Sequence, residues 1–198
     1  MLLQTVQLEN ILKKYLSDKR IAHSRRVANL ARDMAERHGI EWHKAYTAGL
    51  LHDIARDMEK EELVYIVKEH DLYHDPMELD MPILLHTHVG AWIVENELGI
   101  KDETILEAIR LHTLAAPQMD NLAKILYIAD MLEPERNLPG ADELLETAMD
   151  DLDKAMVHCL NSTLKYLIDN GMIIHPLSVE ARNYFLKRLE SDSFCQIF

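Results

Sequence analysis

The chain has 198 residues, of which 48% are hydrophobic, and its formal net charge at pH 7 is −13. This apolar content supports a sizeable core and argues against intrinsic disorder. The negative charge argues against nucleic acid or an anionic membrane surface as a partner. Two cysteines are too few for a disulfide framework. We see no signal peptide in residues 1–10 and no apolar run near the roughly 20 residues of a membrane span, so we expect a cytoplasmic protein.

Capping residues and chain breakers divide the sequence into helices, and no stretch alternates in the manner of a β-strand. In chain order, helices are expected over residues 18–38, 42–53, 82–98, 102–112, 120–130, 142–170 and from 178 onwards. A short charged segment at residues 59–70 comes after the second of these helices, and loops are expected at residues 71–80 and 134–140. The pattern predicts an all-α fold, with residues 1–198 forming one domain.

Polar residues at the expected helix starts suit N-terminal caps, because their side chains can accept hydrogen bonds from free backbone N–H groups. The candidates are Ser17 or Asp18, then Asp102, Asp120 and Ser178. Glycine after a helix and proline in its first turn mark the other boundaries. These residues are Gly39, Pro82, Gly99 and Gly171.

Six ionisable side chains fall on the apolar stripes of five expected helices, each near one end of its stripe. They are His23, His52, Asp53, His86, His112 and Asp130. Such groups are costly to bury unpaired, so six of them aimed at one interior indicate a shared positive centre, most simply a metal ion. Gly49 and Gly90 are expected to let helices approach closely near this site.

The remaining histidines are interpreted as helix-end or surface residues, since a lone histidine on a helix is more often structural than functional. They are His38, His43, His70, His74, His158 and His175. His88 lies two positions past His86 and is expected to point away from the site. Arg26 and Arg110 are expected to pair with neighbouring acids on solvent-facing surfaces.

Five sequence blocks carry a resemblance to a known family. They are Arg20-Ile-Ala-His23-Ser24, Ala48-Gly-Leu-Leu-His52-Asp53-Ile-Ala, Leu84-Leu-His86-Thr-His-Val-Gly90-Ala91, Ala108-Ile-Arg-Leu-His112-Thr113 and Tyr127-Ile-Ala-Asp130-Met-Leu-Glu133-Pro134-Glu-Arg136. In this order they resemble the HD-domain metal-dependent phosphohydrolases, and most closely the symmetrical bis(5′-nucleosyl)-tetraphosphatases of bacteria. The resemblance implies an HD-type helical bundle with a metal site at the converging helix ends. Its motif core covers about residues 18–137, and C-terminal helices over 141–190 complete the bundle.

The metal ligands that we assign are His23, His52, Asp53 and Asp130. Two imidazoles and two carboxylates suit Fe, Mn, Co or Zn, and the resemblance points to iron. One ion is favoured. It would activate a water for in-line attack on phosphorus and draw charge from the phosphate oxygens. Asp53 is the candidate for orienting that water, and it can also bridge to a second ion.

His86 and His112 leave two roles open. As neutral ligands they would hold a second metal ion, and as donors they would contact phosphate oxygens directly. The resemblance favours phosphate contact and with it a catalytic role. Arg20 and Arg136 are placed to grip a polyphosphate, which arginine does bidentately. With Thr113, these residues and the side chains of His23, Asp53 and Asp130 form the expected substrate site.

The resemblance implies a substrate and a reaction. An enzyme of this type would cleave diadenosine tetraphosphate between its central phosphates and release two ADP, although related dinucleoside polyphosphates and other nucleotides also fit. Two alternatives are another HD phosphohydrolase, acting on mononucleotides or cyclic nucleotides, and a non-catalytic nucleotide-binding regulatory domain. The ten methionines are mostly interpreted as core residues and leave a homodimer open.

This chain departs from the family pattern at two places. The family usually continues after His112-Thr113 with a small polar residue and glycine, where this chain reads Leu-Ala-Ala-Pro over residues 114–117. After His86 the family tends to have a small residue and proline, where this chain has Thr87 and His88. Both places lie near the expected substrate entrance, so they put the nucleotide preference in doubt more than the reaction type.

Overall fold

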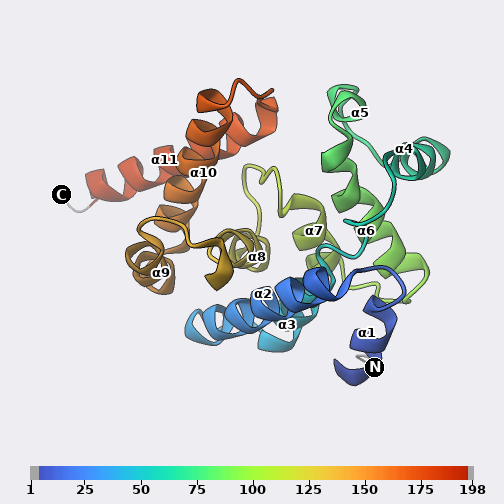
Figure 1. The fold of residues 1–198 in the computed structure, drawn as a ribbon. Coiled ribbons are helices and arrows are strands. Elements are labelled where there is room, and N and C mark those ends of the chain that lie inside the picture. Colours follow the sequence, from blue (N-terminus) through green and yellow to red (C-terminus); the bar gives the residue numbers. More distant parts are fainter. Residues whose placement is uncertain (1–4, 196–198) are drawn as a thin grey trace.

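A computed structural model describes residues 5–195, and within them the chain is all-α with no strand (Figure 1). No helix in that range is both long enough and apolar enough to cross a membrane. Part of the segment that was searched for a signal peptide, residues 1–4, lies outside the described residues. The expectation of a single domain stays a prediction.

Five helices make up the centre of the molecule, close to the bounds that the sequence predicts. They are α2 (Asp18–Arg37), α3 (Trp42–Leu51), α6 (Leu85–Asn96), α7 (Glu103–Leu111) and α8 (Asn121–Met131). In Figure 1, α8 lies between the α2–α3 pair and the C-terminal helices, and it contacts α2, α3, α7 and α10. The central position of α8 follows from its composition, since nearly every residue from Leu122 to Ala129 is apolar and buried.

The close approach of α2 and α3 depends on Gly49. A Cβ atom at this position would lie 2.7 Å from the Cα of Ala28, closer than side chains tolerate. The parallel expectation for Gly90 is wrong. A Cβ there would meet its nearest neighbour, an Ile54 methyl group, at 3.5 Å, which is an ordinary van der Waals contact.

Two of the predicted caps are confirmed, since Asp102 accepts a hydrogen bond from the backbone N of Thr104, and Asp120 accepts one from that of Ala123. Ser17 precedes α2, but its side chain does not cap the helix. Its hydroxyl instead donates to Asp57 Oδ2 over 2.8 Å. The Ser17 side chain therefore holds a distant turn beside the start of α2 instead of capping the helix.

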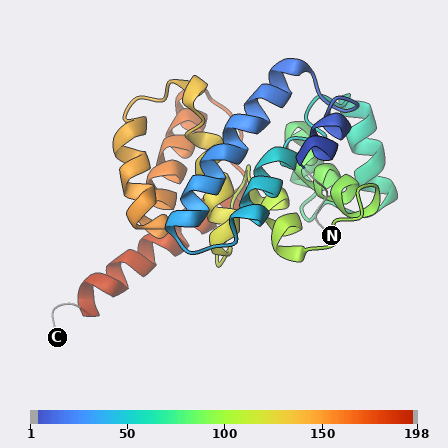
Figure 2. The same ribbon diagram turned by 90° about the horizontal axis from the view of Figure 1, so that it is seen from below.

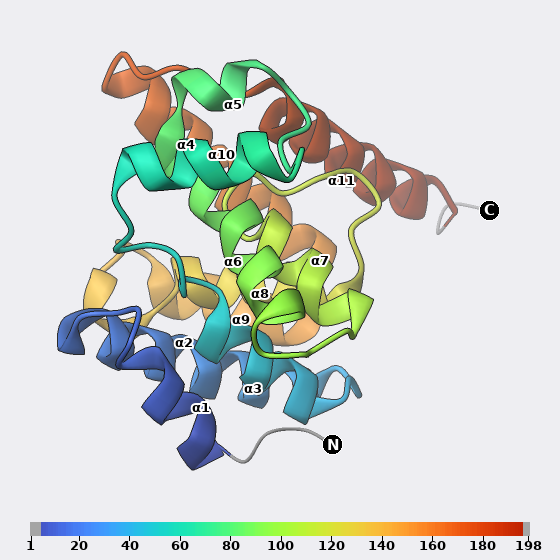
Figure 3. The ribbon, with the colours of Figure 1, turned by 90° about the vertical axis from the view of Figure 1, so that its right-hand side faces the viewer.

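The N-terminal half contains two helices that the sequence did not predict. Helix α1 (Thr5–Leu12) buries Leu8 and Leu12 against the core. The segment 71–80, expected to be a loop, ends in the one-turn helix α5 (Met77–Asp80), which buries Glu78. Figure 3 shows α5 and the charged helix α4 (Lys60–Glu69) beside α6, away from α2 and α3. The 3-10 turn η1 (Pro82–Leu84) leads from α5 into α6.

The long helix expected over residues 142–170 is wrong, because Asp151 divides it. Helix α9 (Ala141–Asp150) ends there, and α10 (Leu152–Asp169) begins. Asp151 has extended backbone angles, and its side chain accepts a hydrogen bond from the backbone N of Lys154, so it caps α10. The 3-10 turn η2 (Pro134–Arg136) lies in the expected loop between α8 and α9.

The last helix, α11 (Pro176–Cys195), packs on α10 at its start and then extends away from the rest of the molecule (Figure 2). The predicted cap at Ser178 is wrong, since the helix already begins at Pro176. The Ser178 hydroxyl donates to the backbone oxygen of Leu114 over 2.8 Å. This bond holds the start of α11 against the loop that follows α7.

Candidate active site

The structure brings the six predicted side chains into one cluster around two carboxylates. On one side, Asp130 Oδ1 lies 3.0 Å from His23 Nε2 and 3.7 Å from His52 Nε2. On the other side, Asp53 Oδ1 lies 3.2 Å from His86 Nε2 and 3.7 Å from His112 Nε2. The two halves join through His52, whose Nε2 is 3.6 Å from Asp53 Oδ2.

Three of the histidines are oriented by their own helices. The Nδ1 atoms of His52 and His112 lie 2.8 Å and 2.7 Å from the backbone oxygens of Gly49 and Ile109, three residues earlier. His86 makes the same contact with the oxygen of Ile83. A carbonyl oxygen can only accept, so each Nδ1 carries the hydrogen, and each neutral ring turns an Nε2 lone pair into the cluster.

The inward nitrogens lack protein hydrogen-bond partners suited to them. Within the described residues, the Nε2 atoms of His23 and His52 are buried and form no hydrogen bond. The Nε2 atoms of His86 and His112 lie only 3.2 Å apart, a distance at which two lone pairs repel unless a proton or cation lies between them. His23, His52 and Asp130 offer ligand atoms within 4.8 Å of one another, as do His52, Asp53 and His112. This donor set fits a divalent metal ion.

Both carboxyl groups of the cluster have pKa values below their ordinary value, which favours binding of a cation. Burial raises the pKa of Asp53, but the nearby His52, His112 and His86 outweigh it and hold that pKa well below its ordinary value. Burial also raises the pKa of Asp130, but its contact with His23 and its interaction with His52 outweigh burial and lower that pKa. Both side chains are therefore carboxylates at neutral pH.

Two of the imidazoles have opposite pKa shifts. Burial lowers the pKa of His52 to about 4, so its ring is neutral and free to act as a ligand. For His23, burial also opposes protonation, but interaction with Asp130 outweighs it and raises the pKa. His23 therefore binds a proton more readily than His52 does.

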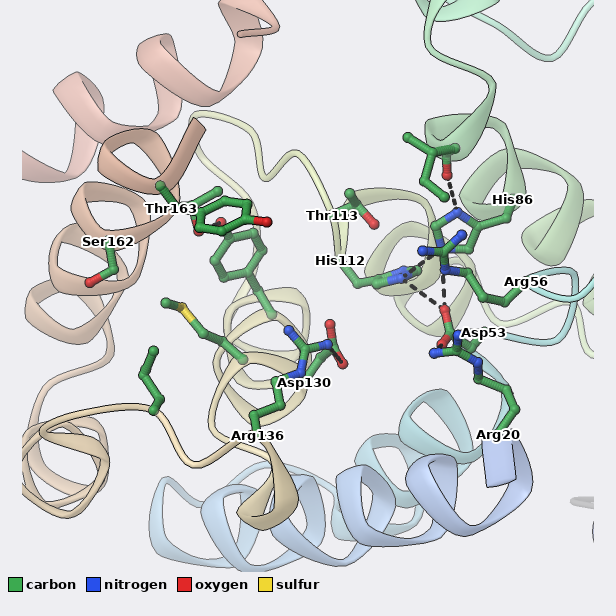
Figure 4. A pocket seen from close by; sticks show the side chains of 15 residues that line it. Arg20, Asp53, Arg56, His86, His112, Thr113, Asp130, Arg136, Ser162 and Thr163 are labelled. Atoms are coloured by element: carbon green, nitrogen blue, oxygen red, sulfur yellow. Dashed lines mark hydrogen bonds and ion pairs between the residues drawn. The ribbon is translucent and has the colours of Figure 1, made fainter. Parts of the chain in front are cut away.

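A pocket of about 440 Å³ opens onto this cluster. Figure 4 shows Asp53, His86 and His112 pointing toward one another on one side of the pocket, with Asp130 at the end of α8 and Arg136 in η2 facing it. Thr113, which the sequence assigned to substrate binding, also lines the pocket. The walls of the pocket combine acids and imidazoles that are buried or nearly so with arginines that are partly buried or exposed.

Three arginines line the pocket, and one of them was not predicted. Arg20 Nη1 lies 3.1 Å from Asp53 Oδ2, and Arg136 Nη2 lies 2.7 Å from Asp130 Oδ1, so both predicted arginines reach the cluster. Arg56 lines the same pocket, and no ion pair ties it to an acid of the described chain. Its position three residues after Asp53 was the available sequence signal. Burial lowers its pKa.

Several expectations about other polar residues are wrong. His175 was interpreted as a helix-end or surface residue but is buried, 6% exposed. His88 points away from the site, as expected, and lies buried beside Glu78 with an Nε2–Oε2 distance of 2.6 Å. Arg26 pairs not only with the exposed Glu135 but also with the buried Glu133. These contacts join residues far apart in sequence. The expectation for Arg110 is confirmed, because it pairs with the exposed Glu103.

Comparison with known proteins agrees with this geometry. The family described as the HD domain matches residues 20–135, a range that includes all six clustered residues. The chain belongs to the HD-domain family. It is an HD-type hydrolase.

The relatives of this HD domain cover most of its length. A protein of Bacillus subtilis named symmetrical bis(5'-nucleosyl)-tetraphosphatase is 37% identical over 170 residues, which are 83% of this chain and 88% of that one. A protein of Halalkalibacterium halodurans with the same name is 34% identical over 176 residues, 89% of this chain and 94% of that one. A crystal structure from Clostridium acetobutylicum, described as that of a predicted HD superfamily hydrolase involved in NAD metabolism, is 34% identical. It superimposes with a TM-score of 0.90 over 95% of this chain and all of that one.

Proposed function

We propose that the protein is a metal-dependent symmetrical bis(5′-nucleosyl)-tetraphosphatase that hydrolyses diadenosine tetraphosphate to two ADP. The observation that carries this proposal is the near full-length match to relatives of that name, in a chain whose pocket holds a complete cluster of candidate ligands. The reaction adds water across the bridge between the two central phosphates. The water oxygen bonds to one phosphorus, the bond from that phosphorus to the bridging oxygen breaks, and a proton is released to solvent.

The residues that would hold a metal ion are His23, His52, Asp53 and Asp130, through the unpartnered nitrogens and the ionised carboxylates described above. A bound divalent ion, with iron the first choice and Mn, Co or Zn as alternatives, would polarise the attacking water and withdraw charge from the phosphate oxygens.

The hydrogen positions on His86 and His112 bear on their roles. Because Nδ1 of each ring already donates to a carbonyl, donation from Nε2 to a phosphate would require a positively charged ring. Burial lowers the pKa of His86 and opposes that charge. These contacts favour the role in which both rings act as neutral ligands of a second cation over the direct phosphate contact that the resemblance favoured.

Asp53 is the residue best placed to orient the attacking water. One of its oxygens faces His86 and the other faces His52, so the carboxylate lies between the two halves of the cluster. It remains ionised at neutral pH and can accept a hydrogen bond from the water while the nucleophile forms. Its contact with Arg20 restrains the carboxylate further.

The pocket also suits the phosphates and nucleosides of the proposed substrate. Arg56 forms no ion pair with an acid among the described residues and can neutralise a phosphate oxygen directly. Beyond Asp130 the wall becomes apolar and aromatic, with Tyr127 and the exposed Tyr166. At Ile83, Thr113 and Thr163 the pocket borders a largely apolar cavity of about 560 Å³. Apolar and aromatic surface beside the charged cluster suits a substrate whose nucleosides are joined by a charged bridge.

Product analysis tests the proposal. The metal-loaded protein is incubated with diadenosine tetraphosphate in ¹⁸O-labelled water, and the products are separated and identified by mass spectrometry. We expect ADP as the sole nucleotide product, with one labelled oxygen for each substrate cleaved. ATP together with AMP would reject symmetrical cleavage, and an absence of any product would reject the substrate.

A second candidate substrate follows from the Clostridium acetobutylicum hydrolase, which is described as involved in NAD metabolism. NAD is also a dinucleotide with an internal phosphate bridge. The same assay should therefore include NAD and mononucleotides. Faster turnover of NAD than of diadenosine tetraphosphate would favour this second function.

A further inference from the structure

His23 differs from the other three histidines of the cluster in what holds its ring. Its Nδ1 lies 3.4 Å from Oε2 of Glu133 rather than near a backbone oxygen. His52 and His112 directly follow the last residues of their helices, where backbone carbonyls lack helical partners. His23 lies in the second turn of the 20-residue helix α2, where the helix itself uses the carbonyls. It therefore needs an acceptor from another part of the chain.

Glu133 provides that acceptor. It follows the end of α8, three residues after Asp130, and is only 3% exposed. Its Oε1 accepts hydrogen bonds from Nε of Arg26 and, over 3.1 Å, from the backbone N of Glu135. The other oxygen, Oε2, is thereby left facing His23. Arg26 lies on α2 one turn after His23, so a single helix supplies both the imidazole and the cation that fixes its acceptor.

We propose that Glu133, held by Arg26, is the positioning residue that fixes His23 with its hydrogen on Nδ1 and its Nε2 lone pair toward the metal site. The inference rests on the proposed metal-dependent function. A carboxylate that accepts from the outer nitrogen of a ligating histidine orients the ring and makes it a stronger ligand. Neither Glu133 nor Arg26 touches the substrate pocket, so they act only through His23.

The test measures the affinity of metal-depleted protein for Mn²⁺ by titration calorimetry, without substrate. Glu133→Ala removes the acceptor and should weaken Mn²⁺ binding by about 10- to 100-fold. Glu133→Gln should weaken it less, because the amide oxygen can still accept. Arg26→Met leaves the carboxylate in place with only the backbone N of Glu135 to restrain it, and should also cause a smaller loss. Glu135→Gln is the matched control, because Glu135 pairs with the same arginine yet is exposed, and it should bind like wild type.

A second measurement separates positioning from a general loss of structure. In histidine-labelled protein at alkaline pH, ¹⁵N shifts report which ring nitrogen carries the hydrogen. We expect His23 to be an Nδ1–H ring in wild type and a mixture of both forms in Glu133→Ala, with His52 unchanged. The inference would be overturned if Glu133→Ala and Arg26→Met both bound Mn²⁺ like wild type, or if the hydrogen position on His23 did not change in Glu133→Ala. Either result would leave the proposed function intact. Wild-type protein that binds no Mn²⁺ would overturn both.

Discussion

Residues 5–195 contain two buried clusters of histidine and carboxylate, and their difference shows what distinguishes a metal site from a structural contact. In the active-site cluster, His52, His86 and His112 each donate the Nδ1 hydrogen to a backbone oxygen and direct an Nε2 lone pair into the cluster. In the second cluster, Nδ1 of His175 accepts a hydrogen bond from the backbone N of Leu177 over 3.2 Å. The hydrogen of a neutral His175 ring is therefore on Nε2, which faces Glu78 and cannot ligate a metal.

The second cluster joins segments of the fold. Glu78 comes from α5, His88 from α6, and His175 precedes α11. Burial raises the pKa of Glu78, but contact with His88 outweighs it and keeps the carboxylate ionised. Residue types and burial are alike in the two clusters, so composition alone does not identify a site. The position of the hydrogen on each ring does.

The largest contrast between the clusters is expected from removing one imidazole in each. His52→Ala should abolish metal retention and lower kcat by at least about 10²- to 10³-fold, because both the ligand and the charge stabilisation are lost. His88→Ala should keep the metal content and turnover of wild type. The measurements are elemental analysis of the purified variants and the diadenosine tetraphosphate assay, with far-UV circular dichroism to show that each variant is folded. Full activity in His52→Ala after chelation and washing would remove His52 from the site.

The second cluster should instead matter for folding. Glu78→Ala leaves His88 and His175 buried without their acid, and should lower the free energy of unfolding by about 3 kcal/mol. Glu61→Ala on the exposed side of α4 is the control and should change little. Urea denaturation measures the difference. Loss of metal binding from folded Glu78→Ala, with stability unaltered, would reverse the roles assigned to the two clusters.

Smaller effects are expected from the arginines, which reach the active site but are not proposed ligands. Arg56→Ala and Arg136→Ala should each lower kcat/KM by about tenfold, or about 1.4 kcal/mol of transition-state binding, with metal content unchanged. Steady-state kinetics on diadenosine tetraphosphate gives the values. Arg110→Ala, which removes an exposed pair with Glu103, is the matched control. Kinetics like wild type in Arg56→Ala would show that its unpaired guanidinium does not bind phosphate.

The smallest effect is a pH dependence in metal-free protein. The pKa of His52 is about 4 when folded, below its ordinary 6.5, so the unfolded chain takes up a proton first as the pH falls. The stability that comes from the neutral ring is present above pH 6.5 and is lost toward pH 4. Between pH 7 and 5.5 this amounts to about 1 kcal/mol. His23 acts in the opposite direction, since its pKa is raised.

His52→Gln isolates this contribution. Wild type should lose about 1 kcal/mol more stability than the variant between the two pH values, as measured by urea denaturation of chelator-treated samples. Equal losses would mean that His52 is not buried as a neutral ring.

What could be predicted from the sequence was set by local rules. Helices α7 and α8 begin where expected, because Asp102 and Asp120 cap them within three residues. The six inward side chains follow from helical periodicity, so their meeting was predictable even without knowing the helix packing. Their roles as ligands stay a prediction.

What could not be predicted depends on contacts between distant segments. The pairing of Arg26 with Glu133 joins residues 107 positions apart, and the burial of His175 depends on where α11 packs. The division at Asp151 was missed for a local reason. An aspartate within a run of helix-forming residues is as compatible with a solvent-facing position inside a helix as with a cap.

The central claim is that the imidazoles with inward lone pairs hold a metal ion. It is tested most directly by crystals soaked in Mn²⁺ and measured at a wavelength where manganese scatters anomalously. We expect a peak in contact with Nε2 of His23 and His52 and with the carboxylates of Asp53 and Asp130, and none beside Glu78 and His175. Anomalous density at Glu78, or none at the first cluster in a protein that hydrolyses its substrate, would contradict the account.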